Sequence, residues 1–528
     1  MAISISTKAL LGLAVISYVA YTILHAVFVS RRNAAKARKL ECLEPPSEES
    51  RLPFSYDQAQ RFDKADKAMQ MPTDMARRYE EAGSYTYRFN LLGTTGFRTA
   101  DPKNIQALLA TQFADFDLGS LRANTFWPLL GSGIFTSDGD GWKHSRAMLR
   151  PQFTRDQISD LELEETHVQN MMKALDSKQT PNSPIETDLL PYFFNLTLDS
   201  ATEFLLGEST SKQLDELGYP AASDRTNHSA TNFGSAFDTA LKGLAARARL
   251  MNFYWLHNPK EFREASRFTH KFVDKFVQHA LAKSVEEKTI QGDDKYTLLN
   301  ALVGETRDPV QLRSEVLHIL LAGRDGTTAS HLGWVFHYLS RDPHRYQKLR
   351  QAILEDFGTY NEPRSLTFAK LKSCRYLRYV NDETLRLNPV VPLNSRRSNK
   401  DTTLPTGGGP DGLSPIFVPN GTEVNYSVYV MQRRKDLWGH DANEFVPERW
   451  EGRKPGWEYL PFNGGPRICI GQQFALTEAN YVIVRLMQRY DRMESLMGKD
   501  EAVKHNLHLT DSIGNGVKVR LHAAAAGT

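Results

Sequence analysis

The sequence predicts a mainly α-helical protein with a small β portion, built as one domain behind an N-terminal transmembrane helix. Three features support this prediction: an uncharged apolar run near the N-terminus, long helical patterns in the middle, and few β-type segments. The chain has 528 residues, 24% charged and 41% hydrophobic, which is a globular composition. Its net charge of +3 is too small to predict a nucleic-acid partner.

An uncharged segment from Ala9 to Ser30 is long enough to cross a bilayer as a helix. At about 1.5 Å per residue it spans about 30 Å, the thickness of the hydrocarbon core. Only Lys8 precedes it, whereas a basic cluster follows, so the positive-inside rule places the remainder of the chain in the cytosol. A cleaved signal peptide is the alternative, although its basic cluster would lie on the wrong side.

The anchor and its basic flank (residues 1–40) are followed by a short connector. Residues 41–53 contain Pro45, Pro46 and Pro53 and therefore predict a stiff, non-helical segment. Residues 54–528 then form one domain, because no second linker or repeat interrupts them.

The longest helical pattern begins at Asp308, an N-cap followed by proline, and ends before Pro343. It predicts one helix of about thirty residues, long enough to cross the core. The β-type segments are 84–100, 402–418, 505–511 and 516–522.

The three cysteines, Cys42, Cys374 and Cys469, are too few and too scattered for a disulfide framework and suit a reducing compartment. Cys42 and Cys374 are interpreted as free structural thiols. Cys469 differs, because the glycines and proline of FNGGPRICIG (residues 462–471) present it from a turn. A helical pattern follows, so N–H groups and the helix dipole favour a thiolate there. Such a cysteine can bind haem iron, act as a nucleophile, or lie in a purely structural turn.

The loop resembles the haem-binding signature of the cytochrome P-450 family: Phe, two residues, Gly, any, Arg, any, Cys, any, Gly. Phe462, Gly465, Arg467, Cys469 and Gly471 fill every specified position. The resemblance implies the P-450 fold and a haem b cofactor whose iron takes the Cys469 thiolate as its axial ligand.

Other segments extend the resemblance. Trp142 and Arg146, four residues apart on one helix face, are implied to contact the haem propionates, with Arg396 as a further contact. Glu383, Arg386 and Arg449 match in type and order a buried structural triad that supports the haem pocket.

The family places Ala-Gly-any-acid-Thr in the long helix, where the acid and threonine deliver protons. In LLAGRDGTTAS, Asp325 matches the acid, but Gly326 stands at the threonine position. We expect Gly326 to be an inserted residue absorbed as a π-bulge, so that Thr327 supplies the alcohol. The alternative is altered proton delivery, as in a haem-thiolate isomerase or dehydratase, or a non-catalytic haem sensor.

From about Leu52 onward the chain resembles the fungal microsomal branch that hydroxylates n-alkanes and fatty acids, some of whose members tailor polyketides or other secondary metabolites. This implies an apolar substrate, the endoplasmic reticulum membrane, and electrons from NADPH through NADPH-cytochrome P-450 reductase. The candidate channel residues are Phe126, Leu129, Leu130, Phe135, Phe233 and Phe237. The candidate reductase-docking residues are Lys143, Arg150 and Arg467.

Overall fold

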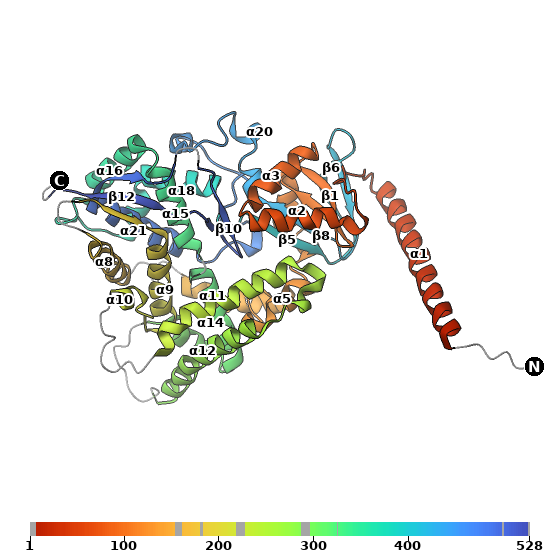
Figure 1. Ribbon diagram of the computed structural model, residues 1–528, viewed down its shortest axis with the longest axis horizontal. Helices are drawn as coiled ribbons and strands as arrows, with labels where there is room; N and C mark the ends of the chain where they lie inside the picture. The colour runs from red at the N-terminus through yellow and green to blue at the C-terminus, as the bar shows by residue number, and fades with distance from the viewer. Residues whose placement is uncertain are drawn as a thin grey trace, which may run out of the picture.

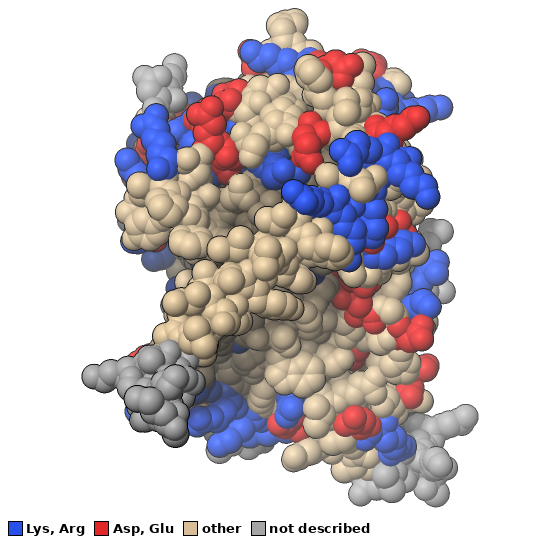
Figure 2. All heavy atoms as spheres, turned by 90° about the vertical axis from the view of Figure 1, so that its right-hand side faces the viewer, with Lys and Arg blue, Asp and Glu red and all other residues tan. Residues whose placement is uncertain are grey.

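The computed structural model describes residues 7–153, 161–179, 183–217, 228–286, 296–324, 326–498 and 501–525. Helix α1 (Thr7–Lys39) stands away from the rest of the molecule as a separate rod (Figure 1). The most apolar 18-residue window of Gly12–Lys39 has a mean hydropathy of 1.9, and none of that window is buried. Figure 2 shows the rod as almost uncharged, with Lys and Arg gathered where it joins the body. Among the described residues α1 is the one candidate membrane span.

The connector after α1 is non-helical, as predicted, and is held against the β-rich part of the body. The backbone N–H of Leu43 donates to the carbonyl of Pro415 at 2.9 Å. The Glu48 carboxylate accepts from Arg78 Nη1 at 2.9 Å. These bonds, together with an ion pair between Lys36 and Asp401, fix the base of α1 to the body.

The body is mainly helical, and its elements run in this order. The α-helices are α2 (Tyr56–Lys67), α3 (Met71–Glu81), α4 (Pro102–Gln106), α5 (Ser120–Leu130), α6 (Gly139–Leu149), α8 (Glu162–Asp176), α9 (Leu190–Leu206), α10 (Lys212–Glu216), α11 (His228–Arg249), α12 (Lys260–Glu286), α13 (Leu298–Glu305), α14 (Pro309–Arg324), α15 (Thr327–Leu339), α16 (Pro343–Phe357), α17 (Phe368–Ser373), α18 (Arg375–Leu387), α19 (Val428–Met431), α20 (Lys435–Trp438) and α21 (Gln472–Arg489). Short helical turns are η1 (Pro53–Ser55), η2 (Ala107–Thr111), η3 (Phe113–Asp115), η4 (Arg150–Phe153), η5 (Met251–Leu256), η7 (Pro447–Trp450) and η8 (Gly465–Arg467).

The β portion is small and lies mostly between α1 and the helical part (Figure 1). The strands are β1 (Thr86–Leu91), β2 (Thr94–Thr99), β3 (Phe116–Asp117), β4 (Ile185–Asp188), β5 (Leu393–Ser398), β6 (Thr402–Gly408), β7 (Ser414–Val418), β8 (Glu423–Ser427), β9 (Tyr490–Ser495), β10 (His505–Leu507), β11 (Asp511–Ile513) and β12 (Lys518–Ala523). The largest sheet has the order β1-β2-β8-β5-β3, and smaller sheets pair β6 with β7, β10 with β11, and β4-β12-β9. Every segment predicted as β-type contains strands.

The predicted long helix is interrupted, and this differs from the sequence expectation. Helix α14 ends at Arg324, and α15 begins at Thr327 after Gly326, whose φ is +84°. A residue in the left-handed region cannot belong to a continuous helix, so the predicted π-bulge is wrong and the chain breaks instead. A Cβ at position 326 would lie 2.8 Å from Ser330 Oγ, which adds a steric reason for glycine. Asp325 lies outside the described residues.

The helical core forms around α15. Its side chains are buried on nearly every face, and Trp334 is 1% exposed. They pack with apolar residues of α8, α9, α16, α18 and α21 in one cluster. A helix that is buried all round positions its first turn rigidly, and that turn faces the cavity described next.

Candidate functional site

A cavity of about 680 Å³ lies between the Cys469 loop, the α14–α15 junction, α6 and strand β5. The structure brings most of the predicted site residues to its wall. Those that line it are Trp142, Arg146, Thr327, Arg396, Phe462, Arg467, Cys469 and Gly471. Gly465, by contrast, does not line the cavity.

Gly465 shapes the turn that presents Cys469. Its φ is +67°, and a Cβ there would lie 1.8 Å from the carbonyl oxygen of Leu109, so only glycine fits. The backbone N–H of Cys469 then donates to the carbonyl of Phe462 at 3.0 Å, closing the loop. Gly471 differs, because a Cβ there would meet Phe153 at an ordinary 3.7 Å. The protein atoms therefore require glycine at 465 but not at 471.

Cys469 is exposed where it lines the cavity, but desolvation by the surrounding protein is the largest influence on its thiol and raises its pKa. The Gly471 N–H and the Arg146 guanidinium lower that pKa, but they do not outweigh desolvation. The Gly471 N–H thus favours the thiolate, as expected for the residues before a helix N-terminus, while desolvation opposes it. A nucleophilic cysteine needs a low pKa, whereas a metal ion brings the charge that deprotonates its thiol ligand. These surroundings favour a metal ligand over a nucleophile.

Buried arginines without a full set of partners face the same cavity. Arg396 is 2% exposed; its Nη1 donates to Ser395 O at 2.7 Å, while its Nε has no partner. Arg467 Nη2 donates to Asp138 Oδ1 at 2.7 Å, and its Nη1 also lacks a partner. Burial lowers the pKa of Arg467 to about 10, and the like charge of Arg396 works in the same direction. Such donors are matched to an anion.

Arg122 on α5 belongs to this cationic wall, and the sequence reasoning missed it. Its Nη2 donates to Asn394 Oδ1 at 2.7 Å, and burial together with the charge of Arg396 lowers its pKa. No motif surrounds Arg122 in the sequence; only the packing of α5 near β5 shows its role. Arg146 completes the group, donating from Nη1 to Ile468 O at 3.0 Å.

These features fit haem b. A flat apolar macrocycle suits the apolar walls, and two propionates suit arginines whose buried N–H groups lack acceptors. The Arg467 guanidinium lies 4.4 Å from the ring centroid of Trp142, so the aromatic and cationic parts of the wall are joined. Cys469 supplies one sulfur ligand to the same space.

The predicted triad is assembled beneath the cavity. Glu383 is fully buried and accepts from Arg386 Nε at 2.8 Å and from Arg449 Nε at 2.9 Å. It also accepts from Trp450 Nε1 at 3.0 Å. Arg386 also donates to the backbone carbonyls of residues 432, 442 and 444. A charge group so fully hydrogen-bonded locks α18 to the segment before the Cys469 loop.

Thr327 lies at the cavity, where the family resemblance implies a proton-delivering hydroxyl group. It lines the cavity, and its Oγ1 donates to the carbonyl of Ala322 at 2.6 Å, across the helix break. The break therefore delivers Thr327 to the cavity, as the predicted bulge would have done by a different route.

Only some of the six predicted channel residues line the cavity. Phe126 and Phe135 line the cavity. Leu129, Leu130, Phe233 and Phe237 do not; they are 0% exposed and pack in the helical core, so their channel prediction is wrong.

Of the three candidate docking residues, two are exposed and one is not. The Lys143 side chain is 69% exposed, and Arg150 is also exposed. Arg467 has a side chain only 8% exposed and points inward, so it cannot meet a partner protein.

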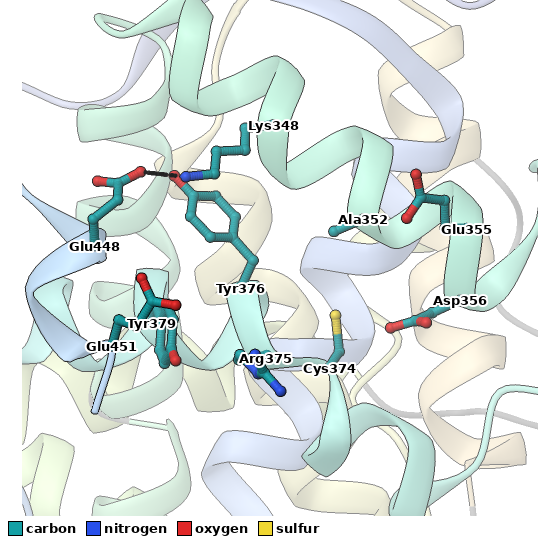
Figure 3. Close-up of a pocket in the computed structure, with 10 residues that line it drawn as sticks. All are labelled: Lys348, Ala352, Glu355, Asp356, Cys374, Arg375, Tyr376, Tyr379, Glu448 and Glu451. Carbon is teal, nitrogen blue, oxygen red and sulfur yellow. Dashed lines mark hydrogen bonds and ion pairs between the residues drawn. The ribbon is translucent and has the colours of Figure 1, made fainter. Parts of the chain in front are cut away.

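A second, smaller pocket of about 370 Å³ contains Cys374 (Figure 3). Helices α16 and α18 and the turn η7 supply its lining, which is rich in charged side chains. Within it, Glu448 accepts from Lys348 at 2.8 Å and from Tyr376 Oη at 2.8 Å. The lining carries four carboxyl groups but only two cationic side chains, so this pocket does not favour an anion.

Comparison with known proteins agrees with this geometry. The cytochrome P450 family model matches residues 46–510. Cytochrome P450 monooxygenase g430 of Fusarium sp is 59% identical over 96% of this chain and 89% of its own length. Cytochrome P450 monooxygenase alt2 of Alternaria solani is 46% identical over 91% of both chains. Cytochrome P450 52A3-A of Candida maltosa is 51% identical over 79% of this chain and 80% of its own. The chain belongs to the cytochrome P450 family.

Proposed function

We propose that Cys469 is the axial ligand of haem b and that the enzyme hydroxylates an apolar, chain-like substrate. The family consists of haem-thiolate monooxygenases, so the cofactor and the class of reaction follow from membership. One observation supports the ligand assignment most: Cys469 shares its cavity with the partnerless donors of Arg396 and Arg467. When bound, the haem supplies oxygen activation and insertion.

The residues around the cavity divide the remaining work. Arg396, Arg467 and Arg122 hold the propionates. The Gly471 N–H and Arg146 favour the charged form of the thiol, against its desolvation. Thr327 holds a proton at Oγ1, close to the cavity. Asp325 is proposed, from the motif alone, as the acid that supplies Thr327.

The cavity wall supports an apolar substrate. Its aliphatic and aromatic lining includes Phe62, Phe126, Ile134, Phe135, Ile319 and Leu509. Such a surface excludes water and binds hydrocarbon by burial. The substrates that fit are an n-alkane, a fatty acid or a polyketide-like chain, of which the first two match the alkane- and fatty-acid-hydroxylating branch that the sequence resembles.

The location and the electron source complete the proposal. Residues 1–40 anchor the protein in the endoplasmic reticulum membrane by a single pass, residues 41–53 connect, and residues 54–528 form the cytosolic catalytic domain. NADPH-cytochrome P-450 reductase supplies electrons by docking near the exposed cations Lys143 and Arg150. An anchor beside the domain suits substrates that dissolve in the bilayer.

Two measurements test this function. The reduced, CO-bound absorbance spectrum of the wild type should show thiolate ligation, and C469S should lack that signal. With reductase, NADPH and an n-alkane or a fatty acid, the wild type should then release a hydroxylated product. A protein that binds haem through another residue, or that consumes no NADPH with any apolar substrate, would contradict the proposal.

The helix break at Gly326 motivates a second candidate, a haem-thiolate isomerase or dehydratase. Such an enzyme needs no external electrons, so it would form product from an oxygenated substrate without NADPH. For hydroxylation, T327A should instead uncouple NADPH consumption from product formation. Normal coupling in T327A would remove the proposed role of the Thr327 hydroxyl.

A further inference from the structure

A small polar group interrupts the apolar lining of the cavity and is separate from the residues assigned to haem. It consists of Asp66 on α2, Arg249 at the end of α11, and His508 in the turn between β10 and β11. All three residues line the cavity. Charged groups in an apolar lining cost desolvation energy that a pure hydrocarbon cannot offset. Their presence therefore indicates a ligand with a polar end.

Arg249 joins the other members of this polar group. Its Nη2 donates to Asp66 Oδ1 at 2.8 Å and to the carbonyl of Leu507, the neighbour of His508, at 2.6 Å. Both bonds that Arg249 makes to described residues come from this one nitrogen, so the donors on Nη1 and Nε are available to a further acceptor. The Arg249 side chain is 28% exposed, which leaves it accessible to a ligand in the cavity.

His508 is held in place by its hairpin, yet one of its ring nitrogens lacks a partner. The backbone N–H of His508 donates to the carbonyl of Thr510 at 3.1 Å. Behind this turn, His505 Nδ1 lies 2.8 Å from Asp511 Oδ2, and both side chains are buried. The Nδ1 atom of His508 is itself buried and has no hydrogen-bond partner in the described part of the chain. Leaving such an atom unpaired is costly, so a ligand that supplies its partner is favoured.

The electrostatic surroundings of His508 favour an anion. Desolvation is the largest influence on the pKa of His508 and lowers it. Arg249 and Lys242 lower this pKa further, and each acts more strongly than Asp66 or Asp238, which raise it. The nearby cations therefore dominate the potential at the ring, which stays neutral and can donate one N–H near pH 7.

The other arginines of the described lining have different partners. Those of the cationic wall beside the Cys469 loop are Arg122, Arg146, Arg396 and Arg467. Arg98 pairs with Glu48, Nη1 to Oε2 at 3.2 Å, and its guanidinium lies 4.6 Å from the ring centroid of Phe89. Of the arginines that the structure describes in the lining, Arg249 is thus the one left for a substrate.

We propose that Arg249 and His508 bind the carboxylate of the substrate, so that the enzyme takes a chain-like carboxylic acid in preference to an n-alkane. Arg249 donates from Nη1 or Nε and His508 from its ring N–H, while the hydrocarbon chain lies along the apolar lining. Asp66 competes with the substrate carboxylate for the same guanidinium. This inference rests on the proposed function, because it names the substrate class of the same cavity.

The test measures binding to the haem-loaded, full-length enzyme by calorimetry, without reductase or NADPH. The two probes are dodecanoate and its methyl ester, which has the same chain but no charge. The wild type should bind the acid about tenfold more tightly than the ester. R249Q removes the charge but still carries an N–H donor for the Leu507 carbonyl. It should weaken dodecanoate binding about tenfold and change ester binding by less than about twofold.

D66N is the matched control, because it alters the other end of the same ion pair. If this pair only fastened α2 to the hairpin, R249Q and D66N would weaken binding alike. Because D66N instead removes a competing carboxylate, it should tighten dodecanoate binding about threefold. H508F keeps an aromatic ring but removes both nitrogens, so it should weaken dodecanoate binding about threefold and spare the ester.

The products of turnover provide a second measurement. With reductase and NADPH, the wild type should hydroxylate dodecanoate mainly at one position, because the bound carboxylate fixes the chain. R249Q should spread the product over more positions, whereas D66N should not.

The inference is overturned if the wild type binds the ester as tightly as the acid, if R249Q binds dodecanoate normally or loses the ester in parallel, or if D66N weakens binding as R249Q does. If R249Q does not retain haem, tighter binding by D66N together with weaker binding by H508F supports the inference, and any other pair of results overturns it. A wild type that binds dodecanoate through Arg249 but forms no NADPH-dependent product overturns the proposed function and leaves this inference standing.

Discussion

Cys469 and Cys374 are chemically identical side chains in pockets of opposite character. Desolvation raises the thiol pKa at both positions, and for Cys374 it does so to about 12. The neighbouring groups also act differently on the two pKa values. The Asp356 carboxylate raises the pKa of Cys374, although the Leu377 backbone N–H lowers it, whereas the Gly471 N–H and Arg146 lower the pKa of Cys469. Exposure differs as well, because Cys374 is buried and Cys469 is exposed where it lines the cavity. A raised thiol pKa therefore does not distinguish a ligand from a structural thiol, while access to a cavity and the charge around the thiol do.

The two pockets also differ in how far their own charges are satisfied. In the Cys374 pocket, Glu448 accepts from Lys348 and Tyr376 (Figure 3). It also accepts from Arg345, which lies outside the pocket lining. Burial would raise the pKa of Glu448, but these donors hold it down at about 2. The cavity above Cys469 has arginine donors that lack acceptors among the described residues. Such donors favour an anionic ligand, whereas the mostly acidic lining of the Cys374 pocket does not.

Exchanging each cysteine for serine is the strongest test of this comparison. C469S removes the only cysteine among the described residues that line the cavity, so the CO-bound thiolate spectrum and the hydroxylation activity should be lost almost completely. C374S should keep both within about twofold, because Cys374 does not line that cavity. The two spectra and turnover with reductase measure this. Full activity in C469S would reverse the assignment of the two pockets.

The two glycines of the Cys469 loop offer the next largest effect. G465A places a Cβ against the carbonyl of Leu109 at a φ of +67°, so it should destabilise the protein by about 3 kcal/mol or more and deplete bound haem. G471A adds only an ordinary contact with Phe153 and should change the unfolding free energy by less than about 1 kcal/mol.

Urea unfolding of the haem-free protein and the haem content per chain separate these cases. If G471A loses haem while its polypeptide stays stable, the bound haem rather than the protein would require glycine at position 471. Equal destabilisation by both changes would contradict the difference seen between the two positions.

Much of this site could be predicted from residues that are close together in the sequence. The spacing of Phe462, Gly465, Arg467, Cys469 and Gly471 predicted the loop, because a ligand-presenting turn is made by consecutive residues. The triad and the pair of Trp142 with Arg146 were found through the resemblance to the P-450 family, because spacing alone shows only that Glu383 with Arg386, and Trp142 with Arg146, share a helix face. The predicted β-type segments contain β1, β2, β6, β7, β10 and β12, whereas β3, β4, β5, β8 and β9 were not predicted.

Features that depend on tertiary packing were not found. Arg122 joins the cationic wall only because α5 packs near β5, and nothing in its own segment signals this. Arg467 has the sequence features of a surface cation, yet Trp142 and Asp138 hold it inside. The break at Gly326 was expected to be a bulge, because sequence spacing reports an extra residue but not the φ that it adopts.

The raised pKa of Cys374 predicts a specific loss of stability in alkali. Because the folded-state pKa is above the ordinary value of 9.0, this thiol stabilises the fold below that pH, and the contribution fades as pH rises toward about 12. By about pH 10 the loss should be about 1 kcal/mol. C374S cannot ionise there, so the gap between urea unfolding curves at about pH 8 and about pH 10 should be smaller than in the wild type. Identical gaps would mean that Asp356 and burial do not hold the proton on Cys374.

The smallest expected effect concerns where electrons arrive. Lys143 is exposed on α6, the helix that carries Trp142 and Arg146 into the Cys469 cavity, while Lys348 lies at the Cys374 pocket and pairs with Glu448. If the reductase docks on the Cys469 side, K143Q should slow reduction by about twofold to fivefold at low salt, and the deficit should shrink as salt screens the charge. K348Q changes the same net charge on the other pocket and should leave the reduction rate unaltered. Stopped-flow reduction under CO measures both variants. A larger effect from K348Q than from K143Q would mean that electrons enter from the Cys374 side, and the two pockets would then differ in ligand chemistry but not in their access to the redox partner.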